Sequence, residues 1–235
     1  MLGVIGGSGV YYLGKTIEKI DVITPYGDAR VHRCSLLKNE LLFIPRHGEA
    51  HQFPPHKVNY RANAYALKKL GASSVFATYS CGIISNYKPG DIILLDDFIG
   101  FTPSVTFFDD FSSGIKHTDL SDPFQLKNLV KQAAKIAKIK LKEGGIPATT
   151  TGPRFETKAE IKALKTLGAN LVNMTTAHEA ILFNELELPF GALGVGTNLA
   201  AGLSRKKLSH SEVMDQMKKV NGKIGSIASE LLKLI

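Results

Sequence analysis

Short apolar runs alternate with amphipathic stretches along most of this sequence. Hydrophobic residues of the amphipathic stretches recur at the three- and four-residue spacing of helices. The apolar runs have the length of buried strands and occur at 41–44, 75–78, 92–95, 171–174 and 190–195. Strands that alternate with helices are typical of α/β proteins. The pattern therefore predicts an α/β fold in which helices flank a central, mixed, twisted sheet.

Two stretches of the chain repeat one arrangement, LKKLGASSVFATYS at 67–80 and LKTLGANLVNMTTA at 164–177. In each, a helix ends at Lys and Leu, a Gly follows that suits a left-handed cap, and a buried strand begins. Both strands end in hydroxyl residues. Small or polar groups also follow the strands before Gly6 and Thr197. We therefore expect four strand ends to meet at one edge of the sheet, where open α/β sheets bind ligands.

The last segment has the pattern of a packing helix, with Ser209 and Glu212 as a capping box at its start. Its apolar positions recur every three or four residues from Val213 to Leu234. Segment 100–124 is a long loop rich in aromatic and turn residues. Loops of this length in compact domains are usually functional or interfacial.

Length and composition favour one globular domain over residues 1–235, since 44% of the residues are hydrophobic and 21% charged. No apolar run approaches the roughly 20 residues that span a bilayer, and no basic residue precedes the first run. We expect a cytoplasmic protein. Cys34 and Cys81 have no ligand or CxxC spacing, so we expect buried thiols and neither a disulfide nor a metal site.

The net charge of +8 raises the question of a nucleic-acid partner. Much of the basic excess lies in lysines between 127 and 142 and in 205–207, positions typical of solvated helix faces and ends. A basic surface would attract a small anionic substrate equally well. Charge alone does not separate these alternatives, although no basic motif interleaved with exposed aromatics supports nucleic-acid binding.

A glycine-rich loop, VIGGSG at 4–9, follows the first strand. It lacks the third glycine of a dinucleotide fingerprint and the Lys-Ser/Thr pair of a Walker loop. Its backbone N–H groups and the Ser8 hydroxyl suit a single phosphate. A tight turn that binds no ligand explains the same residues equally well. Arg46 and His47 follow another strand, and Arg binds anions through paired hydrogen bonds. At 150–161, Pro153 forces a turn and Phe155 and Glu156 enter a helix that runs to Leu167.

Seven stretches carry a resemblance that covers nearly the whole chain: VIGGSG, RHG, PPHKVNYRAN, GPRFETKAEI, NMTTAHE, TNLAAG and LSHSEV. In this order they resemble the trimeric-type purine nucleoside phosphorylase and methylthioadenosine phosphorylase family. The resemblance implies that inorganic phosphate, as co-substrate, splits a purine nucleoside into the free base and ribose 1-phosphate. It implies no metal and no other cofactor, and a homotrimer or a dimer of trimers.

The resemblance also assigns residues. It places the phosphate near Ser8, Arg46, His47, the backbone around Ser80, and Thr176. For the ribose it implies Met174 as an apolar floor, His210 near the 5′-hydroxyl, and His117 reaching in from a neighbouring subunit. For the purine it implies Phe155 against the ring face, with Glu156 and Asn198 at its polar edge. Asn198, Glu156 and His47 would take the catalytic roles.

The types of the two purine-edge residues predict which base is bound. A 6-oxopurine has a carbonyl at position 6 and an N1–H donor, so it suits an amide that donates and a carboxylate that accepts. Asn198 and Glu156 supply that pair. Relatives that cleave 6-aminopurines typically carry Asp and a small hydroxyl residue there. We therefore expect an enzyme that cleaves inosine and guanosine. During cleavage, Asn198 would also accept a hydrogen bond from a proton that arrives at N7 of the leaving base.

Two alternatives stay open, a phosphorylase of 5′-methylthioadenosine or methylthioinosine and a nucleotide- or nucleic-acid-binding protein without turnover. The chain also departs from the family pattern in three places. Pro45 replaces a Gly before Arg-His, 79–84 replaces a Gly-Ser-Leu pattern, and Ala177-His178 replaces Val-Pro before Glu179. The first two lie on the phosphate side, where they would tune or weaken activity.

Overall fold

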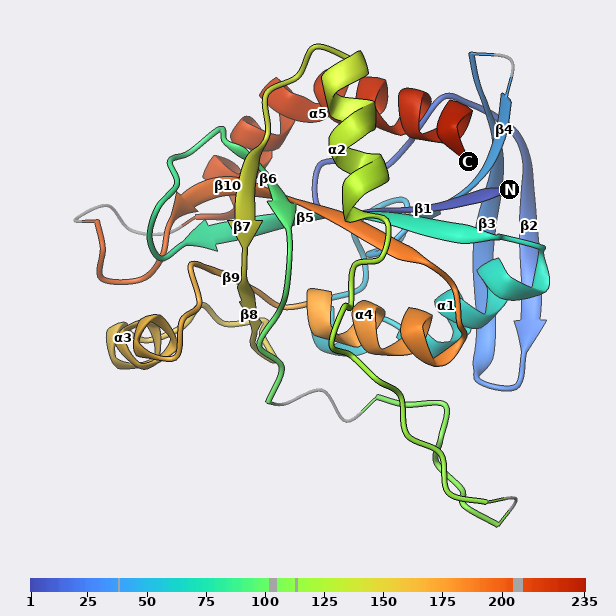
Figure 1. Cartoon of the computed structure of the whole chain (residues 1–235), viewed down its shortest axis with the longest axis horizontal. Helices are drawn as coiled ribbons and strands as arrows, with labels where there is room; N and C mark the ends of the chain where they lie inside the picture. The colour runs from blue at the N-terminus through green and yellow to red at the C-terminus, as the bar shows by residue number, and fades with distance from the viewer. Residues whose placement is uncertain (38, 102–104, 113, 205–208) are drawn as a thin grey trace.

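A twisted sheet of ten strands forms the centre of the computed structural model (Figure 1), which describes all residues except 38, 102–104, 113 and 205–208. The strands are β1 (Leu2–Gly6), β2 (Lys15–Thr24), β3 (Gly27–Leu36), β4 (Asn39–Pro45), β5 (Ser74–Ile83), β6 (Ile92–Leu95), β7 (Lys142–Gly145), β8 (Pro147–Thr149), β9 (Leu171–Asn173) and β10 (Phe190–Leu199). Eight of them follow the order β2-β3-β4-β1-β5-β10-β6-β7, and β9 joins β8 to β5. The four central strands β4, β1, β5 and β10 are parallel, whereas β2 and β3 are antiparallel to their neighbours, and β6 is antiparallel to β10 but parallel to β7.

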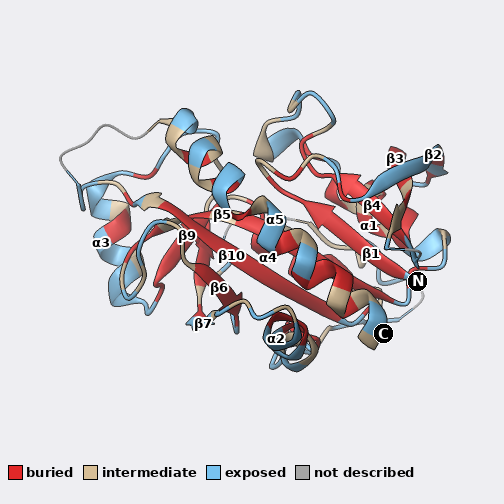
Figure 2. Ribbon diagram, turned by 90° about the horizontal axis from the view of Figure 1, so that it is seen from above, coloured by how far each residue is buried: buried red, intermediate tan, exposed pale blue. Residues whose placement is uncertain are grey.

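Helices cover both faces of this sheet (Figures 1 and 2). One face packs on α1 (Tyr60–Lys69) and α4 (Thr176–Glu185), the other on α2 (Lys127–Ile136) and α5 (His210–Leu234). A 3-10 turn, η1 (Pro55–Lys57), precedes α1, and α3 (Lys158–Thr166) lies at one end of the sheet. The central strands are buried on both faces, which is why they appear in the sequence as continuous apolar runs. The predicted α/β fold with a flanked, mixed sheet is confirmed.

The five apolar runs all form strands, and the two glycine caps are present. Gly71 and Gly168 follow α1 and α3 with φ of +83° and +97°, the left-handed conformation that closes a helix. The sheet hydrogen-bond ladder extends beyond two of the runs, so that β5 and β10 each reach ten residues. Their extensions carry Ser80 and Asn198 to the sheet edge.

The start of α3 differs from the sequence prediction, whereas the start of α5 agrees with it. The helix expected to include Phe155 and Glu156 begins at Lys158 instead, because Thr157 caps it and Glu160 completes a reciprocal capping box. Phe155 and Glu156 stay in the preceding loop, and the helix ends at Thr166. For α5, Ser209 accepts a hydrogen bond from the Glu212 N–H at 3.4 Å.

Sequence patterning missed the hairpin β2–β3 at the sheet edge. Most residues of β2 are exposed, because this strand has a neighbour on one side only and one open face. Its polar composition therefore resembles that of a loop. The strands β7 and β8 were also missed, since four and three residues are too short for a periodic signal.

The cysteines and the charges fit the simpler expectations. Cys34 and Cys81 are buried free thiols. On α2, Lys127 pairs with two aspartates and Lys131 pairs with Glu143, so part of the basic stripe is neutralised locally. The basic run 205–207 lies outside the described residues. No helix in the described ranges is long and apolar enough to cross a membrane.

Candidate active site

A cavity of about 390 Å³ opens at the carboxyl ends of the central strands. Most of the residues predicted for the site line it, from segments far apart in sequence: Ser8 after β1, Arg46 and His47 at the end of β4, Ser80 in β5, Phe155 and Glu156 before α3, Met174 after β9, Asn198 in β10, and His210 at the start of α5. Parallel strands end at the same edge, so the fold itself assembles these side chains.

Arg46 is held by a buried carboxylate beneath the cavity wall. Its Nε and Nη2 donate to the two Glu179 oxygens at 2.6 and 2.7 Å, and Nη1 donates to the Thr78 carbonyl at 3.0 Å. The Tyr79 hydroxyl donates to Glu179 at 2.6 Å, and the Tyr79 ring lies 4.4 Å from the guanidinium. Burial alone would lower the pKa of Arg46, but the Glu179 carboxylate holds it above its usual range. Arg46 therefore stays charged, with a fixed orientation.

Three of the five guanidinium N–H groups of Arg46 are engaged in this way. Arg46 is among the residues that line the cavity, although only 1% of its side chain is exposed. The remaining N–H groups can donate to an anion, and the positive charge is compensated in the absence of one. The cavity thus offers directed donors and little net charge.

Gly7 lies directly against this guanidinium, which explains one glycine of the loop. A Cβ atom there would be 2.6 Å from Nη1 of Arg46 and 2.7 Å from the Thr78 oxygen. Gly7→Ala is therefore expected to lower the free energy of unfolding by about 1–3 kcal/mol, since neither neighbour can move without losing a buried bond. Chemical denaturation measures this.

The matched control for that variant is Gly222→Ala, because nothing lies within 4 Å of the corresponding Cβ on α5. Removing a glycine from a helix should stabilise the protein by about 0.5–1 kcal/mol. Equal effects of the two substitutions would contradict the close approach at Gly7.

Three histidine rings lie in a row, tilted against one another, among the residues that line the cavity. His47 lies 4.7 Å from His51, and His51 lies 5.1 Å from His210, between ring centroids. Nδ1 of His47 is 2.8 Å from the Phe53 carbonyl oxygen, and Nδ1 of His51 is 3.0 Å from the Tyr11 hydroxyl. Burial, together with the neighbouring Arg46 charge, lowers the pKa of His47 to about 4. Burial also lowers the pKa of His51, so both rings are neutral near pH 7.

Threonine hydroxyls orient the two polar residues at the opposite end. Thr150 donates to one Glu156 oxygen at 2.7 Å, and Thr197 donates to Oδ1 of Asn198 at 2.8 Å. Nδ2 of Asn198 donates to the Leu199 carbonyl at 3.1 Å. The β5–β10 register shifts at Thr197, and such a bulge re-aims the neighbouring side chain. Within the described part of the chain, one Glu156 oxygen, one amide N–H of Asn198 and one lone pair of its Oδ1 have no partner and can meet a ligand.

Two predicted residues are not brought into this cavity. Thr176 is fully buried, and its hydroxyl accepts a hydrogen bond from Nδ2 of Asn173 at 2.6 Å. Thr175 lines the cavity in its place, so the expected threonine contact is displaced by one residue. His117 lies in the long loop with its ring 6.1 Å from that of Phe111. Within the described chain it does not reach the cavity.

Sequence reasoning missed three residues of the site. His51 lies four residues after His47, a spacing that would have indicated a shared turn. Thr150 precedes the GPRFET stretch and could have been noted as a hydroxyl next to a carboxylate. Glu179 gave no signal for an ion pair, because its partner Arg46 lies 133 residues away.

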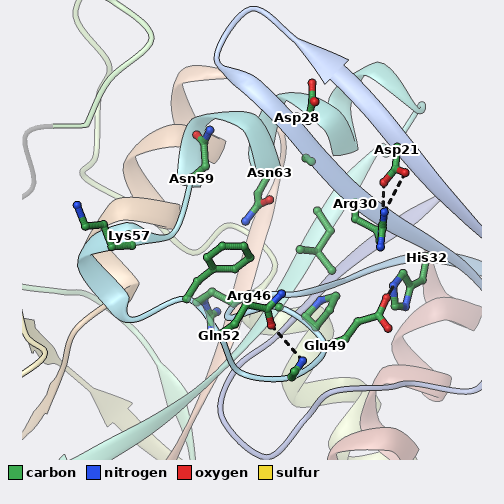
Figure 3. Close-up of a pocket in the computed structure, with 16 residues that line it drawn as sticks. Asp21, Asp28, Arg30, His32, Arg46, Glu49, Gln52, Lys57, Asn59 and Asn63 are labelled. Carbon is green, nitrogen blue, oxygen red and sulfur yellow. Dashed lines mark hydrogen bonds and ion pairs between the residues drawn. The ribbon is translucent and has the colours of Figure 1, made fainter.

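A second cavity of about 540 Å³ lies beside the first, against the β2–β3 hairpin and α1 (Figure 3). Four of its polar side chains form two pairs: Arg30 binds Asp21 through two hydrogen bonds, and Glu49 bonds His32. The purine-edge residues are absent from its lining among the described residues. The smaller cavity is therefore the candidate active site.

Comparison with known proteins agrees with this arrangement. The family model of the phosphorylase superfamily matches residues 1–233. The chain belongs to this superfamily. Among curated relatives of this phosphorylase, a probable 6-oxopurine nucleoside phosphorylase from Moorella thermoacetica is 43% identical, over 94% of this chain and 88% of the relative. The 6-oxopurine nucleoside phosphorylase of Pyrococcus furiosus is 38% identical, over 100% of this chain and 92% of the relative.

A relative with a different name and a solved structure are also similar to this phosphorylase. A probable S-methyl-5′-thioinosine phosphorylase from Methanopyrus kandleri is 36% identical, over 100% of this chain and 92% of the relative. Methylthioadenosine phosphorylase from Schistosoma mansoni, solved with adenine, superposes with a TM-score of 0.91 at 29% identity. That match covers 99% of this chain and 90% of the solved chain.

Proposed function

We propose that this phosphorylase cleaves 6-oxopurine nucleosides, inosine and guanosine, with inorganic phosphate to give the free base and ribose 1-phosphate in purine salvage. The observation that carries the proposal is one cavity lined at one end by Glu156 and Asn198 and at the other by Arg46 and His47. The names of the relatives from Moorella and Pyrococcus support the same substrate class.

The base end fits an oxopurine. Glu156 has one oxygen bonded to Thr150 and one free to accept N1–H. Asn198 can donate its remaining N–H to O6, and its Oδ1 can accept a second hydrogen bond from N7–H. Phe155, 42% exposed at the cavity, supplies an apolar face for the purine ring. A site with such paired groups rejects a base that leaves them unpaired.

The chemistry follows from the two ends. A phosphate oxygen forms a bond to C1′ of the ribose while the bond from C1′ to N9 breaks, and its electrons pass into the purine. N7 of the departing base takes a proton from solvent water, Asn198 accepts a hydrogen bond from that N7–H through Oδ1, and its Nδ2 donates to O6. Met174 lies where an apolar floor for the sugar is needed. Ser8, Ser80 and Arg46 orient the phosphate, with Thr175 rather than Thr176 nearest to it.

The proposal is tested by release of free base from inosine, guanosine, adenosine and methylthioadenosine, each with and without inorganic phosphate. We expect phosphate-dependent cleavage of inosine or guanosine to lead. Cleavage of inosine without phosphate, or adenosine as the best substrate, would contradict the proposal.

A second candidate function is phosphorolysis of 5′-methylthioinosine, which carries the same 6-oxopurine. His210 and Val213 lie one helical turn apart on α5, and both line the cavity. His210 suits a 5′-hydroxyl, whereas Val213 suits a methylthio group. Comparing kcat/KM for inosine and methylthioinosine separates these substrates, since both satisfy the base end.

We also propose that the protein is a homotrimer or a dimer of trimers. The middle of the long loop, residues 109–120 apart from Ser113, extends away from the body of the molecule below α1 and α4 (Figure 1). Phe111 and Ile115 in this loop are 49% and 73% exposed. Large apolar side chains exposed together often mark a surface that binds another protein chain. His117 lies on this segment, where it would reach a neighbour's cavity. A cytoplasmic location remains an expectation from the sequence.

The assembly is tested with Phe111→Ser/Ile115→Ser. We expect a lower oligomeric state in analytical ultracentrifugation and at least about tenfold lower kcat/KM for inosine, because a site completed by its neighbour needs the assembly. A wild-type protein that is monomeric and fully active would overturn this proposal.

A further inference from the structure

Hydrogen phosphate and sulfate are tetrahedral dianions of similar size, but near neutral pH only phosphate carries a proton on one oxygen. We propose that His47 selects hydrogen phosphate over sulfate by presenting Nε2 as a hydrogen-bond acceptor to the phosphate hydroxyl. The inference rests on the proposed function, because it places the phosphate beside His47. It adds selection between two anions to the phosphate-binding and catalytic roles expected of this residue.

The tautomer of His47 follows from its backbone contact. Nδ1 lies 2.8 Å from the carbonyl oxygen of Phe53, and a carbonyl can only accept. Nδ1 therefore carries the proton, and a neutral imidazole then has a lone pair and no hydrogen at Nε2. Among the described residues none bonds Nε2, and the ring lines the cavity.

The surroundings of His47 keep the ring neutral. The charged and titratable groups that face it are the Arg46 guanidinium and the rings of His51 and His210. Glu156 is the carboxylate that lines the same cavity, at the purine end. Burial and the Arg46 charge lower the pKa of His47 to about 4. A proton on Nε2 is thus unfavourable at neutral pH before an anion binds.

The other phosphate-side groups cannot tell the two anions apart. Arg46 attracts both dianions equally, and Glu179 already balances its charge. The hydroxyls of Ser8 and Ser80 can each turn to donate to either anion. An acceptor is the one kind of group that demands a proton from the ligand, and His47 provides it.

Sulfate in the same place would set an oxygen lone pair against the Nε2 lone pair. An unpaired acceptor at a buried contact weakens binding by about 10- to 100-fold. The alternative is that His47 takes up a proton when sulfate binds, which makes sulfate affinity rise as the pH falls. Arsenate keeps its hydroxyl at neutral pH and should bind like phosphate.

The first experiment is calorimetric titration of the whole protein at pH 8 with sodium phosphate and sodium sulfate at equal ionic strength. The titrations are run with and without saturating hypoxanthine, so that an ordered mechanism does not hide anion binding. We expect phosphate to bind at least about tenfold more tightly than sulfate. We also expect sulfate affinity to increase from pH 8 to pH 5.5. A ratio below about tenfold at pH 8 overturns the inference.

The second experiment uses His47→Gln, which places an amide that can donate where the acceptor was. The ratio of phosphate to sulfate affinity should fall at least about fivefold, because the amide N–H satisfies a sulfate oxygen. The control is His56→Gln, an exposed histidine of the same segment outside the cavity lining, which should keep the wild-type ratio. A smaller fall in His47→Gln overturns the inference.

The outcomes separate this inference from the proposed function. Equal binding of phosphate and sulfate, with phosphate-dependent cleavage of inosine, overturns only the role of His47. Binding of neither anion, together with no phosphate dependence of base release, overturns both. The wild-type pH series decides the matter even where a His47 variant fails to fold.

Discussion

Glu179→Gln is expected to lower the free energy of unfolding by about 3–5 kcal/mol, the cost of leaving a buried charge without its partner. Arg46 and Glu179 are 1% and 3% exposed, and Tyr79 also donates to the carboxylate. A glutamine keeps the shape of the side chain but removes its charge. It also replaces one carboxylate oxygen with an NH₂ group, which would face the N–H and O–H donors of Arg46 and Tyr79. Urea denaturation followed by circular dichroism measures the change.

Companion variants distinguish a charge effect from a packing effect. Tyr79→Phe removes one hydrogen bond to a carboxylate that Arg46 still pairs, so it should cost only about 1–3 kcal/mol. Removing both charges with Arg46→Met/Glu179→Leu should recover most of the stability lost in Glu179→Gln, since buried ion pairs can often be replaced by apolar groups. The double variant should nevertheless fail to bind phosphate.

A small effect of Glu179→Gln, below about 1 kcal/mol, would contradict the buried pair. A double variant that is less stable than Glu179→Gln would contradict the argument that the unpaired charge is the cause. The packing around this ion pair also explains two departures from the family pattern, Tyr79 and His178. Tyr79 donates to the carboxylate that holds Arg46, and His178 stacks on Tyr60 with the ring centroids 4.5 Å apart, so both side chains have packing roles.

The fold was predictable where burial is continuous. The run at 190–195 lies in β10, which has neighbours on both sides and helices on both faces, so its residues are apolar whatever the details. The hairpin β2–β3 was not predictable from the same rule, because an edge strand with an open face tolerates polar residues. Local capping likewise decided the start of α3, where Thr157 and Glu160 bond each other and exclude Phe155 and Glu156.

The site was predictable to the level of strand ends. Parallel strands bring their carboxyl ends to one edge, so Ser8, Arg46 and Asn198 could be placed together without coordinates. What the sequence could not reveal is how each group is held. The choice of Thr175 over Thr176 depends on where a helix begins, and the Glu179 bond to Arg46 depends on tertiary packing.

Asn198→Asp is expected to lower the ratio of kcat/KM for inosine to that for adenosine by about 100-fold or more, because the aspartate accepts from a 6-amino group and cannot donate to a 6-carbonyl. Thr197 can still donate to the new carboxylate at the position it holds now, so the side chain keeps one anchor. In the wild type, Nδ2 of Asn198 donates to the Leu199 carbonyl oxygen at 3.1 Å. The second carboxylate oxygen of the aspartate is repelled by that carbonyl oxygen, so we expect it to turn toward the base.

Glu156 limits the reversal, since its free oxygen would face the N1 acceptor of adenine. Asn198→Asp/Glu156→Ser should therefore raise adenosine cleavage above that of the single variant, because the serine hydroxyl can donate to N1. Asn63→Asp is the control: it adds the same charge on α1, outside the candidate active site, and should leave the ratio unchanged. Steady-state kinetics of base release with both nucleosides gives the ratio. Equal losses for inosine and adenosine in Asn198→Asp would mean that Asn198 stabilises the leaving group without choosing the base, and base selection would then rest on Glu156 alone.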